Sequence, residues 1–396
     1  MRDTTNRVRG TISAHPRKRD LATQFLTKVM VELRRNRPSL DLGQSWYVRY
    51  DQVRGRTFAQ LWFSTNGCSW DRRGECVMCN YGHHTKVDWM EMVAFVQDGL
   101  GSIDRPVYEL YVSPSGSLLD EREVPVRARH SILQLVNDFP AERFSFETRP
   151  ETVTASTISE LRNLVPSKRI AIGFGLESTD PWILRNCINK PNTNDTFTTA
   201  ITHMSGIDLY ANVSLGSAFL SPVEAVDDAV HSVNWALIHG ADLALVFPMH
   251  VKGYTLLNWL HDRGLYEPPS LWSLVEVLTR LDPALVKRVI ISWYRADYGV
   301  DSGVIASPTT CPNCKEAVLV ALDKFREEPS IESVGRLMAI GCACRQIWMG
   351  KFEIPVQPLA ERVFNIYHLL AGDLGLTEWL KERESALITE MTRAEP

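Results

Sequence analysis

Short apolar runs alternate with helical patterns between residues 58 and 250, and this alternation restricts the fold more than any other feature of the chain. Parallel strands need long crossover connections, so regular strand–helix alternation favours βαβ units. Six such units close into part of a barrel whose functional groups lie at the carboxyl ends of the strands. The expected strands are residues 58–64, 107–112, 144–148, 170–176, 209–215 and 243–247.

The segments between these strands are expected to be helical. Ser221-Pro222-x-Glu224 combines an N-cap serine, a proline at the first helical position and a glutamate at the third. The sequence therefore predicts an α/β protein with a partial (βα)6 barrel over residues 58–250. A basic helical extension precedes it in residues 1–57, and a cysteine-rich helical module follows in residues 251–396. The expected helices are residues 89–100, 122–139, 155–164, 181–186 with 194–205, and 221–238.

The composition is that of a globular protein, with 44% hydrophobic and 23% charged residues and a net charge of −4. This acidic balance does not favour a large nucleic-acid footprint. The first 37 residues are locally basic, with ten Lys/Arg against three Asp/Glu, and form either a solvated helix or a contact to phosphate. No apolar run approaches the ~20 residues of a membrane span, and no secretory signal is recognisable. We expect a cytoplasmic protein without membrane contact.

Three of the eight cysteines follow the first expected strand with the spacing C-x7-C-x2-C, as Cys68, Cys76 and Cys79. Three thiolates on one loop can hold three irons of a [4Fe–4S] cluster and leave the fourth iron open. The amine and carboxylate of S-adenosylmethionine can chelate that iron, and reduction of its sulfonium yields a 5′-deoxyadenosyl radical. The alternative is a zinc site completed by His83 or His84.

Further motifs follow the later strands in a fixed order. They are SPSGSLLD at 113–120, ETRPE at 147–151, GFGLES at 173–178 and GSAFLSP at 216–222, followed by KGYTL at 252–256 and YEPP at 266–269. In this order they resemble the radical S-adenosylmethionine enzymes related to the Elongator catalytic subunit. Within that group they are most similar to the archaeosine synthase radical subunits and their uncharacterised relatives. The resemblance covers roughly residues 58–350.

The resemblance implies roles for individual residues. Cys68, Cys76 and Cys79 would hold the cluster, and Met78 stands between two of them where the superfamily usually has an aromatic residue. The cofactor's amino group would face the small residues after the second strand, and its carboxylate or ribose would meet groups after the third and fourth strands. No catalytic residue is assigned. The implied cofactor contacts after the strands are Ser115, Gly116, Ser117, Glu147, Arg149 and Glu177.

Structural alternatives stand beside some of these roles. Glu147 and Arg149 could form an ion pair at the barrel rim, and Glu177 could be a structural carboxylate. Cys187 has no cysteine near it in the sequence and is interpreted as a packed thiol.

A second cysteine group lies in the C-terminal module, as the pairs Cys311/Cys314 and Cys342/Cys344. Four thiolates fit a closed tetrahedral zinc site that pins the module. They also fit a second [4Fe–4S] cluster, or they stay unligated. Helices are expected over residues 315–325 and 358–370, packed on the open side of the barrel.

The resemblance implies hydrogen abstraction from a modified nucleoside in tRNA, with cleavage of a C–N bond as in archaeosine formation. Flavodoxin or ferredoxin would be the electron donor. Residues 247–252 and 293–303 depart from the family where substrate should reach the barrel, which favours a small-molecule substrate of natural-product biosynthesis instead. Within the second segment, Tyr294, Asp297, Tyr298 and Asp301 suit a small polar or cationic substrate. A non-catalytic metal-binding scaffold is the third hypothesis.

Overall fold

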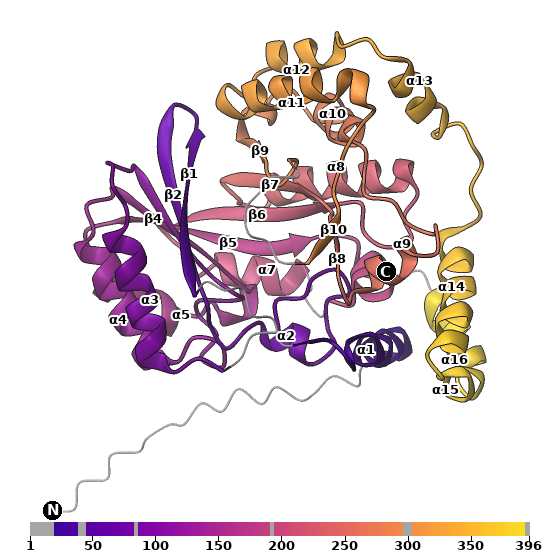
Figure 1. The fold of residues 1–396 in the computed structure, drawn as a ribbon, viewed down its shortest axis with the longest axis horizontal. Helices are drawn as coiled ribbons and strands as arrows, with labels where there is room; N and C mark the ends of the chain where they lie inside the picture. The colour runs from indigo at the N-terminus through magenta and orange to yellow at the C-terminus, as the bar shows by residue number, and fades with distance from the viewer. Residues whose placement is uncertain (1–19, 39–44, 83–85, 191–193, 296–302, 393–396) are drawn as a thin grey trace, which may run out of the picture.

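The computed structural model of the chain describes residues 20–38, 45–82, 86–190, 194–295 and 303–392. Its centre is a sheet of eight strands in the order β1-β2-β3-β4-β5-β6-β7-β9, curled into part of a barrel (Figure 1). All neighbours from β2 to β9 pair in parallel, and only β1 is antiparallel. The strands are β1 (Trp46–Val53), β2 (Arg56–Phe63), β3 (Glu109–Pro114), β4 (Arg143–Thr148), β5 (Arg169–Glu177), β6 (Asp208–Leu215), β7 (Leu243–Pro248) and β9 (Val289–Ile291).

The six expected strands correspond to β2 through β7, so the predicted partial barrel is confirmed. Two strands extend it at its edges. β1 forms a hairpin with β2 through Arg54 and Gly55, which both have positive φ (55° and 70°), as a tight primed turn requires. β9 has only three residues, too few for a period-2 pattern to be recognised.

The helices that follow the strands cover the outer face of the sheet, as the alternation predicts. α8 begins behind Ser221, whose side chain and that of Glu224 form a capping box with N···O distances of 3.4 and 2.7 Å. Its burial on β6 and β7 adds to one continuous apolar core. These helices are α3 (Trp89–Gly101), α4 (Val126–Asp138), α5 (Ala155–Leu164), α7 (Asn194–Ile201), α8 (Pro222–Ile238) and α10 (Leu271–Arg280).

The open side of the barrel, between β1 and β9, is covered by α11 (Pro312–Glu327), as expected for the helix near residues 315–325. Arg326 of α11 forms an ion pair with Asp51 of β1 at 2.6 Å. On the other edge, Tyr294 donates a hydrogen bond of 2.5 Å to Asp323 of α11. The helix therefore bridges both edges of the sheet.

The helix expected near residues 358–370 is present as α14 (Leu359–Asp373), but it packs against α1 (Leu21–Arg34) instead of the open side. The rings of Phe25 and Tyr367 are 4.7 Å apart, and the Tyr367 hydroxyl donates to the carbonyl of Asn186 at 2.8 Å. A second apolar core forms there from both ends of the chain (Figure 1). Across the described part of the chain, no helix is both long and apolar enough to cross a bilayer.

Candidate cluster and cofactor site

The three cysteines of the triplet lie on one loop at the carboxyl end of β2. Cys68 precedes the short helix α2 (Ser69–Arg72), and its N–H donates to the carbonyl of Tyr81 at 3.0 Å. Cys76 has a positive φ of 58°, which is unusual for a residue with a side chain. Its N–H donates to the carbonyl of Asn189 at 3.1 Å, so the loop is tied to the chain beyond β5.

A buried cluster of ion pairs between the N-terminal helix region and the loop supports the loop's conformation. Asp71 is completely buried, and its carboxylate forms ion pairs with Arg34 and, at 3.3 Å, with Arg37. The Arg34 guanidinium also donates to the carbonyls of Cys76 and Cys79, each at 3.1 Å. The predicted basic extension thus places part of its charge against the cysteine loop, a role that no local sequence signal indicates.

The thiols have unequal acidities because of their surroundings. Burial raises the pKa of the Cys68 thiol to about 12, with a contribution from the nearby Glu123 carboxylate. The hydrogen bond between Cys76 and Cys79 raises the pKa of Cys76 and lowers that of Cys79. Metal ligation stabilises the thiolate form, so bound metal cations would offset the raised pKa values of Cys68 and Cys76.

The end of β3 approaches the cysteine loop closely. Gly116 has φ of 137°, and a Cβ there would lie 2.1 Å from Oε2 of Glu123 and 3.3 Å from Cα of Cys68, so only glycine fits. The adjacent Ser117 N–H donates to Glu123 at 2.6 Å. The buried hydroxyl of Ser115 has no hydrogen-bond partner among the described residues.

A second buried hydroxyl without a partner in the described structure belongs to Ser217, just after β6. The sequence motif included this serine, but sequence reasoning assigned it no role. Such groups are costly unless something satisfies them, so both hydroxyls indicate a polar ligand at this edge of the barrel.

Arg149 and Glu147 point to different environments instead of to each other. Arg149 forms ion pairs with Glu123 at 2.7 Å and Glu151 at 2.9 Å, and it also contacts Asp120. Its Nη1 is 3.8 Å from Sγ of Cys68. Glu147 instead accepts a hydrogen bond of 2.8 Å from Asn212.

Glu177 lies at a bulge between β5 and β6 with φ of 65°. It accepts hydrogen bonds from Lys190 at 2.7 Å and from Ser214 at 2.5 Å. Lys190 is buried and lies 5.8 Å from the centroid of the Trp70 ring on the cysteine loop. Lys190 comes 13 residues after Glu177 in the chain, and its place beside the site follows only from the fold.

Other residues singled out in the sequence have simpler environments. Met78 is half-buried against the second apolar core, and Cys187 is fully buried within that core. Tyr294 is buried in its contact with α11. His83, His84, Asp297, Tyr298 and Asp301 lie outside the described residues, as does the N-terminal arm of residues 1–19.

The second cysteine group comes together as the spacing predicts. The Sγ atoms of Cys311 and Cys314, of Cys311 and Cys342, and of Cys314 and Cys344 are each 3.5 Å apart. All four ligand atoms lie within 4.8 Å of one another. Zn–S bonds of about 2.3 Å imply tetrahedral S···S distances of about 3.8 Å, close to this arrangement.

Two neighbours polarise this group. Desolvation opposes ionisation, but hydrogen bonds from Thr310 at 3.3 Å and from Nε1 of Trp272 at 3.2 Å help lower the pKa of Cys344 to about 6. A thiolate at this position is a ready metal ligand.

Comparison with known proteins finds homologues that match most of this chain. No family model matches it. Archaeosine synthase subunit beta of Methanosarcina acetivorans is 27% identical over 348 residues, which are 83% of this chain and 96% of that protein. The protein of the same name from Thermococcus kodakarensis is 28% identical over 316 residues, 77% of this chain and 95% of its own.

Among solved structures, Elp3 of Methanocaldococcus infernus with an N-terminal deletion aligns with a TM-score of 0.43 at 16% identity, over 60% of this chain and 58% of that one. The sequence relatives, matched over most of both chains, confirm the resemblance that the motif order indicates.

Proposed function

We propose that this homologue of archaeosine synthase subunit beta, a radical S-adenosylmethionine enzyme, abstracts a hydrogen atom from a modified nucleoside, with tRNA as its carrier. A [4Fe–4S] cluster with S-adenosylmethionine supplies the 5′-deoxyadenosyl radical for such a step when both are bound. The proposal depends above all on one placement: Cys68, Cys76 and Cys79 share a loop against the carboxyl end of β3.

The residues around that loop fit a bound amino-acid group. Cys68, Cys76 and Cys79 would hold three irons and leave the fourth to the cofactor. The backbone at Gly116 permits close approach, and the buried hydroxyls of Ser115 and Ser217 offer hydrogen bonds that no described protein group takes. Of these two hydroxyls, that of Ser115 belongs to an implied cofactor contact, and that of Ser217 was found only in the structure.

The charged residues near the loop would orient the cofactor, because ion pairs and hydrogen bonds hold their side chains in place. Arg149 links the cysteine loop to the carboxylates of Asp120 and Glu123, so it orients the floor of the cofactor site. Glu177, held by Lys190, is placed to accept from ribose hydroxyls. Burial raises the pKa of Glu147, whose carboxyl accepts a hydrogen bond from Asn212 inside the barrel.

For the second cysteine group we propose zinc. Sulfur atoms 3.5 Å apart surround the volume of one tetrahedral ion, whereas a four-iron cluster would hold them farther apart. Cys311 and Cys314 stand at the start of α11, so the ion would anchor the helix that covers the open side of the barrel. Its role would be structural.

A small-molecule substrate is the second candidate function. The barrel encloses a cavity of about 490 Å³, within the range of sites for small ligands. The basic arm of residues 1–19, which could contact RNA, lies outside the described structure.

The test is anaerobic. The protein is reconstituted with iron and sulfide, reduced, given S-adenosylmethionine, and assayed for 5′-deoxyadenosine with and without precursor-bearing tRNA. We expect cleavage in the intact protein, none in Cys76→Ala, and full cleavage in the Cys187→Ala control. Stimulation by tRNA supports the nucleoside substrate, and its absence favours the small molecule. Cleavage that survives Cys76→Ala contradicts the site assignment.

A further inference from the structure

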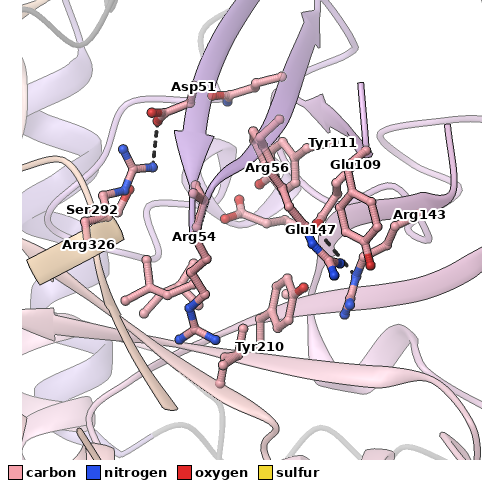
Figure 2. A pocket seen from close by; sticks show the side chains of 18 of the residues that line it. Asp51, Arg54, Arg56, Glu109, Tyr111, Arg143, Glu147, Tyr210, Ser292 and Arg326 are labelled. Carbon is pink, nitrogen blue, oxygen red and sulfur yellow. Dashed lines mark ion pairs between the residues drawn. The ribbon is translucent and has the colours of Figure 1, made fainter. Parts of the chain in front are cut away.

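The inside of the barrel contains a cavity of about 490 Å³ (Figure 2). Its walls are residues of β1 to β7 and β9, together with Arg326 of α11. Near the cofactor end it is lined by Glu147, Tyr111 and Asn212. At the other end, where the strands begin, it is bordered by Arg54, Arg56 and Arg143, and we call this end the arginine mouth.

The arginine mouth gathers cations from separate elements. Arg54 and Arg56 belong to the β1–β2 hairpin and are solvent-exposed, and Arg143 begins β4. The guanidinium of Arg56 lies 4.0 Å from the centroid of the Tyr108 ring, which holds it in place without neutralising it. Arg54 is oriented by a hydrogen bond of 2.7 Å to the carbonyl of Lys287, also a neutral partner.

The acidic groups of the cavity do not balance these cations. Five arginines line it against three carboxylates. Asp51 is engaged by Arg326 of α11 at 2.6 Å, and Arg143 is shared between Glu109 at 3.5 Å and Asp208. Burial also raises the pKa of Glu109 and of Glu147, which favours their neutral forms. A net positive charge therefore remains at the arginine mouth, centred on Arg54 and Arg56.

We propose that the arginine mouth binds the oxyanion, a phosphate or a carboxylate, of a small ligand that occupies the barrel cavity. This inference rests on the second candidate function, a small-molecule substrate, and specifies that substrate: one end is anionic, and the other reaches toward the cofactor end. Guanidinium groups recognise oxyanions through paired, charge-assisted hydrogen bonds. The cavity has room for a nucleotide-sized molecule but not for a folded RNA.

The geometry also sets the length of that ligand. Arg143 and Glu147 lie four residues apart on β4, which corresponds to about 13 Å at ~3.3 Å per residue. The two ends of the cavity are thus about that far apart when measured along β4. Tyr111, which stacks on Phe58, and Tyr210, whose ring centroid lies 5.3 Å from the Arg143 guanidinium, also line the cavity.

The test is a calorimetric titration of the reconstituted protein, without S-adenosylmethionine, at low salt. The probes are sodium pyrophosphate and sodium citrate. We expect saturable 1:1 binding of at least one probe, weakened at least tenfold in the double variant Arg54→Gln/Arg56→Gln. Arg105→Gln is the matched control, because Arg105 is an exposed arginine already paired with Asp104, and it should bind as the intact protein does.

Each outcome is informative. Pyrophosphate alone indicates a phosphate ligand, citrate alone a carboxylate, and both the shared oxyanion chemistry. Absence of saturable binding by either probe, or equal affinity in the double variant, overturns the inference. Arg56→Lys, which keeps the charge, should lose less affinity than Arg56→Gln and replaces the double variant if that protein does not fold. Deoxyadenosine formation is measured in parallel, so failure of the cluster site is distinguishable from failure of the arginine mouth.

Discussion

Arg34 and Asp71 form a buried ion pair between the N-terminal helix and the loop that carries the three cysteines. The same guanidinium donates to two carbonyls of that loop, those of Cys76 and Cys79. A residue 34 positions before the first cysteine thus determines the shape of the loop. The ion pair holds the cysteine loop against α1, and its loss would leave a buried carboxylate with Arg37 as its one cationic partner among the described residues.

Replacing Arg34 with Met should therefore reduce cluster assembly. Removing one partner of a buried ion pair typically costs about 3–5 kcal/mol, because the other charge stays buried. We expect iron bound per chain after reconstitution to fall by at least half, measured by iron analysis and visible absorbance. Arg35→Met is the control, since Arg35 is exposed and pairs with Glu32 of the same helix. Full iron loading of Arg34→Met would show that the Arg34–Asp71 ion pair is not needed to hold the cysteine loop.

The buried hydroxyl of Ser115 should contribute to binding of S-adenosylmethionine and not to folding. Because no described group bonds to it, Ser115→Ala should leave the melting temperature unchanged. A lost hydrogen bond of about 1 kcal/mol corresponds to roughly a fivefold rise in Kd for the cofactor, measured by equilibrium binding. Ser117→Ala is the contrasting variant: its hydroxyl contacts Thr148, so its melting temperature should fall. Equal melting losses in both would refute the assignment.

The second cysteine group should bind one metal ion and stabilise the C-terminal module. Cys314→Ala should remove that ion, lower the unfolding temperature and leave the iron of the first cluster intact, as measured by elemental analysis and calorimetry. Cys187→Ala serves as the control, because this buried thiol lies outside the group. A loss of about four irons per chain would instead identify a second cluster.

Stability should depend on pH through Asp228. Burial raises the pKa of this carboxyl to about 7, against an opposing hydrogen bond from Ser178, whereas an unfolded aspartate titrates near 4. The folded state thus holds the proton more tightly, so this contribution to stability is present below pH ~4 and is lost as pH rises through ~7. The full effect is on the order of 4 kcal/mol.

Asp228→Asn removes the titration while keeping an acceptor for Ser178. The free energy of unfolding of the variant relative to the intact protein should therefore rise between pH 5 and pH 8, measured by denaturant titration at several pH values. Subtracting the two curves cancels the other titrating groups. A difference that does not change with pH would show that Asp228 titrates normally in the folded protein.

Much of the barrel could be predicted because its information is local. The apolar runs of β2 to β7 and the helix caps between them, such as Ser221 with Glu224, follow from neighbouring residues. The pairs Cys311/Cys314 and Cys342/Cys344 were also recognisable, since short spacing restricts where thiolates can point. The hairpin strand β1 escaped prediction because its alternating residues are nearly all half-buried, without a clear apolar face.

The sequence by itself indicated the alternation of strands β2 to β7 with helices and the cysteines that can ligate metal, because period and spacing act over a few residues. Only the tertiary structure decided which distant charges meet. Arg149 could have paired with Glu147 but contacts Asp120, Glu123 and Glu151 instead, since β-strand neighbours two apart diverge once the strand ends. The arginine mouth likewise exists only because curling of the sheet brings the starts of β2 and β4 to one opening.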